Sequence, residues 1–191
     1  MNEAARLEAL AAAIGARLQA RGWRLAVAES CTGGGVGFAL TQVAGASDWF
    51  ERGFVTYSNE AKRQMLAVPA AALRAHGAVS EPVARAMALG ALARSRSQVA
   101  LAVTGVAGPG GGSRAKPVGT VWLAWAAQAR RGAPLAVIVE RHRFAGDRAA
   151  VRTGAIRAAL EGVVRILDRD QSRPPARGAR PLGRAAARKS A

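Results

Sequence analysis

Residues 24–35 read RLAVAESCTGGG, a short apolar run that passes directly into a polar, glycine-rich turn. The apolar part, 24–28, predicts a buried strand. Before it, residues 7–18 carry apolar side chains at helical spacing, and Gly22 ends that helix. After it, a second helix is expected over 36–44. This order of helix, buried strand, glycine turn and helix indicates a layered α/β domain.

The rest of the chain continues the alternation of strands and helices. Further strands are expected over 49–56, 98–103, 119–126 and 135–144. The last two are joined by a basic turn around Gly132, which suggests an antiparallel pair. Further helices are expected over 59–66, from a Ser80 cap onward, and over 146–167. The pattern predicts a three-layer α/β/α sandwich around a mixed, mostly parallel sheet.

Composition indicates a globular protein with a positive charge. Half of the 191 residues are hydrophobic, and 28 Lys and Arg outweigh 12 Asp and Glu, giving a net charge of +16. Six of these cations lie in 171–191, which has no acid, so 1–170 keep 22 basic against 12 acidic residues. A basic body favours an anionic ligand such as a phosphate, a nucleotide or nucleic acid. We assign a domain to 1–168 and a basic tail, expected to be disordered, to 169–191.

The sequence favours a cytoplasmic protein without a membrane segment. Residues 1–10 have no basic start followed by an apolar stretch, so we expect no signal peptide. Nowhere do eighteen apolar residues run together. Cys31 is the single cysteine, which excludes an internal disulfide and suits a reducing compartment.

Unusual residues follow three of the expected strands. They are 29–35 after the first, Tyr57 to Asn59 with Lys62 after the second, and Thr104 with the glycine-rich loop 105–112 after the third. Ligands of open α/β sheets bind outside the carboxyl ends of the strands, so parallel strands would bring all three clusters to one crevice. Neither glycine loop completes GxGxxG or the GK[ST] ending of a P-loop. The glycines either make tight turns or expose backbone N–H groups to an anion or a developing oxyanion.

Ser30, at the turn after the first strand, is a candidate nucleophile, but a serine needs a base. Lys62 is the candidate base, because a lysine in a partly desolvated pocket loses proton affinity and can take a proton from a hydroxyl. Tyr57 could relay that proton or hold the oxyanion. The alternative for Lys62, an ordinary solvated helix residue, stays open.

Other nucleophiles and bases are less well placed. His76 and His142 lie outside the three clusters, which argues against a Ser-His-Asp triad. Two scattered histidines and one cysteine do not predict a zinc site. Cys31 is a rival nucleophile if a helix N-terminus lowers its pKa, although no imidazole stands beside it.

Five segments carry a resemblance to a known family. They are AESCTGG (28–34), GFVTYSNEAK (53–62), HGAVSEPVARAMA (76–88), VTGVAGPGGG with KPVGTVW (103–122) and FAGDRAAVRTGAI (144–156). In this order and spacing, over about residues 5–168, the chain resembles the CinA C-terminal domain family, whose stand-alone members look like nicotinamide-nucleotide amidohydrolases. The resemblance implies an α/β/α sandwich, a homodimer, and hydrolysis of nicotinamide mononucleotide to nicotinate mononucleotide and ammonia without metal or cofactor. That reaction would serve pyridine nucleotide recycling.

The resemblance also implies roles for particular residues. Ser30 matches the nucleophile position, and Tyr57 and Lys62 match the positions that activate it. Substrate-binding positions would be Cys31, Thr32, Gly33, Gly34, Asn59, Thr104, Gly105 and, for an anion, Arg148. The N-terminal domain that often precedes this module in the family does not occur in these residues, and the basic tail is an addition to the family pattern.

A different class of function stays open. The family name comes from proteins linked to competence and DNA damage. A non-catalytic member could bind nucleotide or nucleic acid. The basic tail has no aromatic residue for base stacking, so its contact with nucleic acid would be weak, non-specific and salt-dependent. A solvated tail without a partner, and a member that keeps the pocket but has lost amidase activity, are the remaining alternatives.

Overall fold

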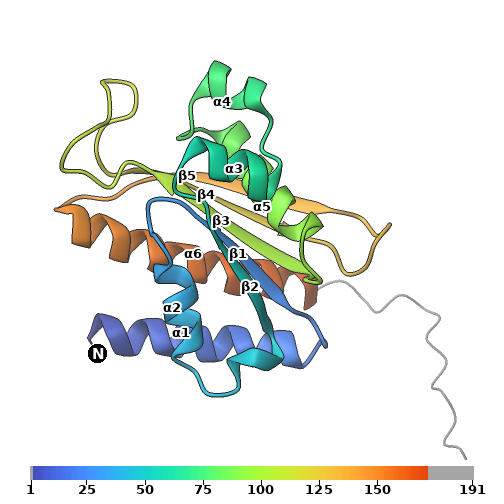
Figure 1. Ribbon diagram of the computed structural model, residues 1–191. Helices are drawn as coiled ribbons and strands as arrows, with labels where there is room; N and C mark the ends of the chain where they lie inside the picture. The colour runs from blue at the N-terminus through green and yellow to red at the C-terminus, as the bar shows by residue number, and fades with distance from the viewer. Residues whose placement is uncertain (1, 172–191) are drawn as a thin grey trace, which may run out of the picture.

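Five strands form one sheet in the order β2-β1-β3-β4-β5 in the computed structural model, which describes residues 2–171 (Figure 1). The strands are β1 (Leu25–Glu29), β2 (Phe50–Val55), β3 (Val99–Gly105), β4 (Thr120–Ala127) and β5 (Ala136–Arg143). β1 is the centre of a parallel trio, because it pairs with β2 on one side and β3 on the other. β4 is antiparallel to both β3 and β5, which confirms the expected antiparallel pair and makes the sheet mixed.

Helices cover both faces of this sheet. One face carries α1 (Glu3–Gln19), α2 (Gly35–Thr41) and α6 (Arg148–Gln171), and the other carries α3 (Asn59–Leu66), α4 (Ala70–His76) and α5 (Glu81–Ala93) (Figure 1). The three-layer α/β/α prediction is confirmed. A 3-10 turn, η1 (Ala46–Asp48), connects α2 to β2. No helix within residues 2–171 is long and apolar enough to cross a membrane.

Two apolar cores result, one on each face of the sheet. Larger side chains such as Leu25, Val27 and Leu101 face α1, α2 and α6. The opposite face of the sheet is lined by alanines, at Ala28, Ala100, Ala102, Ala124 and Ala126. Their small size lets α5 pack closely, and α3 packs on α5 so tightly that a Cβ at Gly90 would overlap the Leu66 carbonyl. This packing holds α3 close to the sheet.

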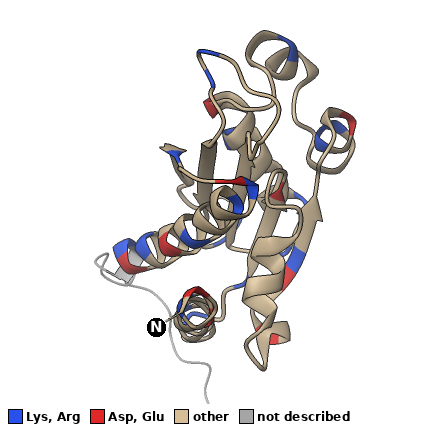
Figure 2. Cartoon of the chain, turned by 90° about the vertical axis from the view of Figure 1, so that its left-hand side faces the viewer, with Lys and Arg blue, Asp and Glu red and all other residues tan. Residues whose placement is uncertain are grey.

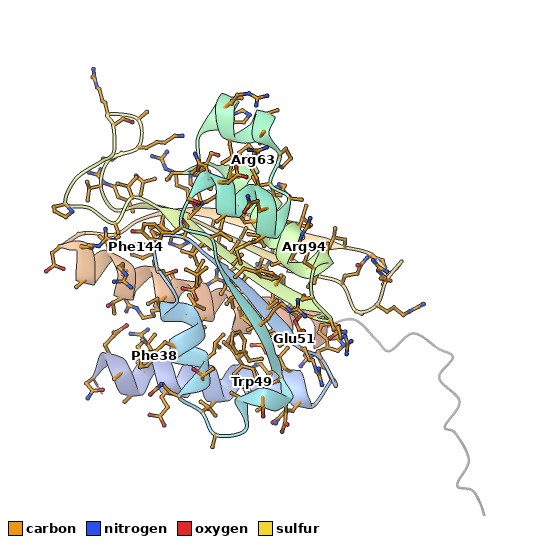
Figure 3. The ribbon with its side chains drawn as sticks, viewed as in Figure 1. Phe38, Trp49, Glu51, Arg63, Arg94 and Phe144 are labelled. Carbon is orange, nitrogen blue, oxygen red and sulfur yellow. The ribbon has the colours of Figure 1, made fainter. Side chains whose placement is uncertain are left out.

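Trp49 fixes the start of the edge strand β2 to α1 (Figure 3). Its side chain is buried, and a Cβ at Gly15 of α1 would lie 2.7 Å from the indole nitrogen. A glycine in the middle of α1 therefore makes room for the indole. β2 is exposed over much of its length, so this anchor helps to hold it in the sheet.

Element ends differ from the sequence predictions in a few places. α2 ends at Thr41 rather than at 44, because Gly45 adopts a left-handed φ of 78° and starts η1. α6 continues to Gln171, three residues past the expected domain end at 168, because neither Gly nor Pro interrupts it there. The disorder predicted for the basic tail is wrong for residues 169–171, which belong to α6. The other residues of the tail, 172–191, lie outside the described part of the chain.

Candidate active site

The carboxyl ends of β1, β2 and β3 lie side by side, so the three sequence clusters meet at one edge of the sheet. The Ser30 N–H donates to the Val103 carbonyl of β3 at 2.9 Å. On the other side of β1, the Thr56 N–H donates to the Glu29 carbonyl at 2.7 Å. Ser30 lies two residues after Ala28, so strand alternation turns its side chain toward the face covered by α3 and α5.

Lys62 reaches Ser30 from the first turn of α3. Ser58 caps this helix by accepting from the Ala61 N–H at 3.0 Å, which fixes how α3 leaves the sheet edge. Lys62 Nζ then donates to Ser30 Oγ at 3.0 Å and to the Thr56 carbonyl at 2.7 Å. Lys62 is 1% exposed, so the alternative of a solvated helix residue is wrong.

Burial gives the Lys62 amine the character of a base. Among residues 2–171 no carboxylate forms an ion pair with it, and desolvation lowers its pKa from the ordinary value of 10.5. Lowering the pKa raises the fraction of neutral amine near neutral pH. A neutral amine at hydrogen-bond distance from a hydroxyl can accept the hydroxyl proton.

The turn after Ser30 is held from within by Glu29. Its carboxylate is 1% exposed and accepts three peptide N–H groups, from Gly34 at 3.0 Å, Val36 at 3.0 Å and Gly37 at 2.8 Å. Gly34, with a φ of 92°, needs the left-handed freedom that glycine supplies. The carboxylate thus satisfies the open N–H groups at the start of α2 and fixes the turn that carries Ser30.

Two peptide N–H groups of this turn make no hydrogen bond to another described residue. Gly33 N–H donates to the Ser30 carbonyl at 3.0 Å and Gly34 N–H to Glu29, so neither is open to a ligand. Cys31 and Thr32, by contrast, donate their N–H groups to no other described residue, and the Cys31 N–H lies against its own thiol. The donors available for an oxyanion are therefore the two that directly follow Ser30.

Cys31 itself is poorly placed to be a nucleophile. Its side chain is buried in the core shared by α1, α2 and α6, on the face of the sheet opposite to α3. Burial raises the pKa of the thiol to about 11. The thiol is therefore protonated at neutral pH, which disfavours the rival mechanism.

Tyr57 stands at the outer edge of the site rather than beside Lys62. It is 59% exposed, and its hydroxyl accepts from Arg148 Nη2 at 2.8 Å, with no hydrogen bond to Ser30 or Lys62. Arg148 also donates through Nη1 to the Gly108 carbonyl at 2.8 Å. Arg148 thus links the loop after β2, the glycine-rich loop after β3 and the start of α6.

The other predicted positions divide into two groups. Thr104 is buried at the end of β3 and donates to the Ala78 carbonyl at 2.9 Å, and Gly105 leaves no room for a side chain against Thr120. Both lie at the same sheet edge as Ser30. Asn59 is the exposed first residue of α3 and makes no hydrogen bond to Ser30 or Lys62, so its predicted role is not supported by a contact.

Sequence reasoning missed three contributors to this geometry. Glu29 was noted in its cluster without a role, because it lies at the end of β1, five residues before the N-cap Gly34, where spacing gives no sign of a capping carboxylate. Thr56 acts through its backbone carbonyl, for which the sequence has no signal. Arg152, one helical turn after Arg148, donates to the Thr32 carbonyl at 2.7 Å, and that spacing was the available clue.

Known proteins resemble this chain over most of its length. The nicotinamide-nucleotide amidohydrolase PncC of Escherichia coli (strain K12) is 53% identical over 148 residues, which cover 78% of this chain and 87% of that protein. The protein of the same name from Pseudomonas putida is 50% identical over 157 residues, covering 82% and 94%. The CinA-like protein of Syntrophobacter fumaroxidans is 52% identical over 165 residues, and this chain spans only 38% of its length.

Solved structures agree with the sequence relatives. The competence/damage inducible protein CihA from Agrobacterium tumefaciens superposes with a TM-score of 0.79 at 46% identity, covering 85% of this chain and 96% of that chain. The sequence pattern of the CinA C-terminal domain matches residues 7–167. The chain therefore belongs to the CinA C-terminal domain family.

Proposed function

We propose that the protein hydrolyses the carboxamide of nicotinamide mononucleotide, giving nicotinate mononucleotide and ammonia. The observation that carries this proposal is the buried Lys62 amine 3.0 Å from Ser30 Oγ, beside the two peptide N–H groups that follow Ser30. Such a pair suits acyl transfer from an amide. The choice of substrate follows the relatives named nicotinamide-nucleotide amidohydrolase, which are about half identical to this chain over most of their own length.

The reaction begins when neutral Lys62 takes the Ser30 proton as Oγ attacks the carboxamide carbon. The N–H groups of Cys31 and Thr32 stabilise the oxyanion of the tetrahedral intermediate. Collapse of the intermediate breaks the C–N bond, and the Lys62 ammonium gives its proton to the leaving ammonia. The Ser30 ester is then hydrolysed by water, whose proton passes to Lys62 and returns to Ser30 Oγ.

Tyr57 takes no part in the proton transfers of this scheme. Lys62 contacts Ser30 directly, so no tyrosine is needed to relay the first proton. The phenol is exposed and its hydroxyl is held by Arg148. We propose that the phenol contacts the bound substrate.

The test uses purified protein and nicotinamide mononucleotide, with ammonia and nicotinate mononucleotide as readouts. Ser30→Ala should lower kcat by about 10³-fold or more, because the nucleophile is lost. Ser47→Ala, an exposed serine in η1, is the matched control and should keep full activity. Full turnover in Ser30→Ala with an intact fold would remove the mechanism.

A further inference from the structure

A cavity of about 650 Å³ lies at the end of the sheet opposite to Ser30. It is bordered by the last turns of α5, by residues 95–98 before β3, and by the turn between β4 and β5. In Figure 1 this turn and the glycine-rich loop lie at opposite ends of the sheet. From Ser97 at the cavity the chain runs to Val103, whose carbonyl accepts the Ser30 N–H. This length of extended chain spans about 20 Å, so a small molecule in the cavity does not touch the Ser30 hydroxyl.

The charge around this cavity is one-sided. Its lining contains Arg96, Arg130 and Arg131 and no acidic residue from the range 2–171. Along α6, by contrast, basic and acidic residues lie together, and two of its arginines form ion pairs with glutamates (Figure 2). Arg130 and Arg131 take part in no salt bridge within the described residues. Glu51 interacts with Arg96, but both of its carboxylate oxygens bind Arg52, at 2.6 and 2.7 Å. The excess of positive charge favours an anionic ligand.

The Ser97 hydroxyl is a second, independent sign of a ligand. Ser97 lines the cavity and is only 9% exposed, and its Oγ has no hydrogen-bond partner among the described residues. The Gln128 side chain nearby is occupied, because its Nε2 donates to the Ala133 carbonyl at 2.9 Å. A buried hydroxyl without a partner costs free energy, and a ligand oxygen at this place would satisfy it.

Apolar side chains form the rest of the lining. Leu89, Leu92 and Ala93 come from the last turns of α5, and Leu135, which is 47% exposed, directly precedes β5. Covering an exposed leucine with the apolar part of a ligand is favourable. The volume falls within the roughly 300–1,000 Å³ of small-molecule sites, which combine apolar walls with a few polar groups. The cavity therefore suits a small ligand that has both an anionic and an apolar part.

We propose that this cavity binds a small phosphate ester with an apolar or aromatic body, at a site separate from the amide substrate. Arg96, Arg130 and Arg131 bind the phosphate oxygens through charge-assisted hydrogen bonds. The Ser97 hydroxyl donates to one further oxygen, and Leu135 covers the apolar body. A phosphate ester carries up to two negative charges at neutral pH, which matches several arginines better than a single carboxylate does.

The experiment titrates the isotope-labelled full chain with phenyl phosphate and follows the backbone amide signals by NMR. Saturable shifts are expected at residues 95–98 and 128–135. Inorganic phosphate and phenol, each of which lacks one part of the ligand, should bind more weakly. Shifts confined to the turn after Ser30, or no shifts at millimolar phenyl phosphate, would overturn the proposal. These signals need no amidase activity, so this proposal and the proposed function can fail separately.

Two arginine variants test the anionic part of the site. Arg130→Gln with Arg131→Gln should raise the Kd for phenyl phosphate at least about tenfold, because charge-assisted hydrogen bonds are lost. The matched control, Arg74→Gln with Arg114→Gln, removes two exposed arginines elsewhere on the surface and should change Kd less than about twofold. Equal changes in the two pairs would show only general charge attraction and would contradict the site.

Ser97→Ala tests the buried hydroxyl. It should raise the Kd for phenyl phosphate about 3- to 10-fold and leave Tm unchanged or slightly higher, because the hydroxyl has no partner to lose in the free protein. A lower Tm with an unchanged Kd would show that Ser97 serves only the fold, against the proposal. A single-stranded oligonucleotide that binds through Arg130 and Arg131 while phenyl phosphate does not would make the ligand a nucleic acid and would also overturn it.

Discussion

Lys62 has no carboxylate partner in the described part of the chain, and its amine is buried against Ser30 Oγ and the Thr56 carbonyl. Its pKa in the folded protein is lowered by desolvation, whereas in the unfolded chain it returns to about 10.5. Between these two pKa values the unfolded chain binds more protons than the folded one. Folding is therefore favoured by rising pH in that interval and is penalised below it.

This linkage gives a prediction for stability. The free energy of unfolding of the wild type, relative to Lys62→Met, should increase as pH rises from the folded pKa of Lys62 toward 10.5. The increase should be about 1.4 kcal/mol for each unit that separates the two pKa values. Denaturant unfolding of both proteins across pH 6–10 measures it. A difference that stays flat over that range would mean that the folded pKa of Lys62 is ordinary.

Cys31 gives a second prediction at the scale of the residue. Its thiol is buried and its pKa is raised to about 11, while its useful group is the peptide N–H. Cys31→Ala keeps that N–H, so kcat should stay within a few-fold of the wild type while stability falls by about 1 kcal/mol. Steady-state kinetics and thermal unfolding check both. Loss of activity comparable to that of Ser30→Ala would restore the thiol as the nucleophile.

The turn between β1 and α2 depends on a single carboxylate. Glu29 accepts the N–H groups of Gly34, Val36 and Gly37, and the same strand end positions Thr56, whose carbonyl holds Lys62. Hydrogen bonds to a charged acceptor contribute about 1.5–3 kcal/mol each. The Glu29 carboxylate and the end of β1 therefore help to fix the positions of both Ser30 and Lys62.

The substitution Glu29→Gln tests whether this carboxylate holds the turn between β1 and α2. An amide cannot accept all three N–H groups, so we expect a loss of about 2–3 kcal/mol in stability and at least a tenfold fall in kcat. Glu60→Gln is the control, because Glu60 is exposed and, among residues 2–171, its carboxylate contacts Arg63 and Gln64 on the surface. Its effect on stability should stay below about 1 kcal/mol. A Glu29→Gln protein with wild-type turnover would show that the turn keeps its shape without the carboxylate.

The elements were largely predictable from local patterns, and the site only in part. Apolar spacing identifies α1 and α6, and the uninterrupted apolar run 24–28 identifies β1, because these signals lie within one segment. The burial of Lys62 lies outside any local pattern. It follows from the packing of α3 on α5 at Gly90 and from the alanines of β1 and β3 beneath them, which sequence spacing does not reveal. The spacing of Arg148 and Arg152 places both on one face of α6, but the bond from Arg152 to the Thr32 carbonyl depends on how α6 packs against the turn after β1.

At the scale of the molecule, the described residues contain the whole proposed site, and residues 172–191 of the basic tail lie outside them. Deleting residues 172–191 should therefore leave kcat and KM for nicotinamide mononucleotide unchanged within about twofold. The same deletion removes six cations, so any weak, salt-dependent binding to nucleic acid should fall. Filter binding at two salt concentrations and steady-state kinetics measure these effects. A large loss of turnover would give the tail a part in catalysis.

The homodimer implied by the resemblance and the cytoplasmic location favoured by the sequence remain predictions at this scale. Light scattering coupled to gel filtration measures the mass of the particle directly. A mass twice that of the 19.7 kDa chain is expected, and a monomer that is fully active would contradict the dimer.

The most direct test of the whole account is the titration of the Lys62 amine. The chain has three lysines, Lys62, Lys116 and Lys189, so Lys116→Arg with Lys189→Arg leaves Lys62 as the single lysine for isotope labelling and NMR. The account predicts a midpoint clearly below 10.5 that coincides with the acid limb of kcat/KM for the free enzyme. A midpoint at or above 10.5, with activity already full at neutral pH, would contradict Lys62 as the base that activates Ser30.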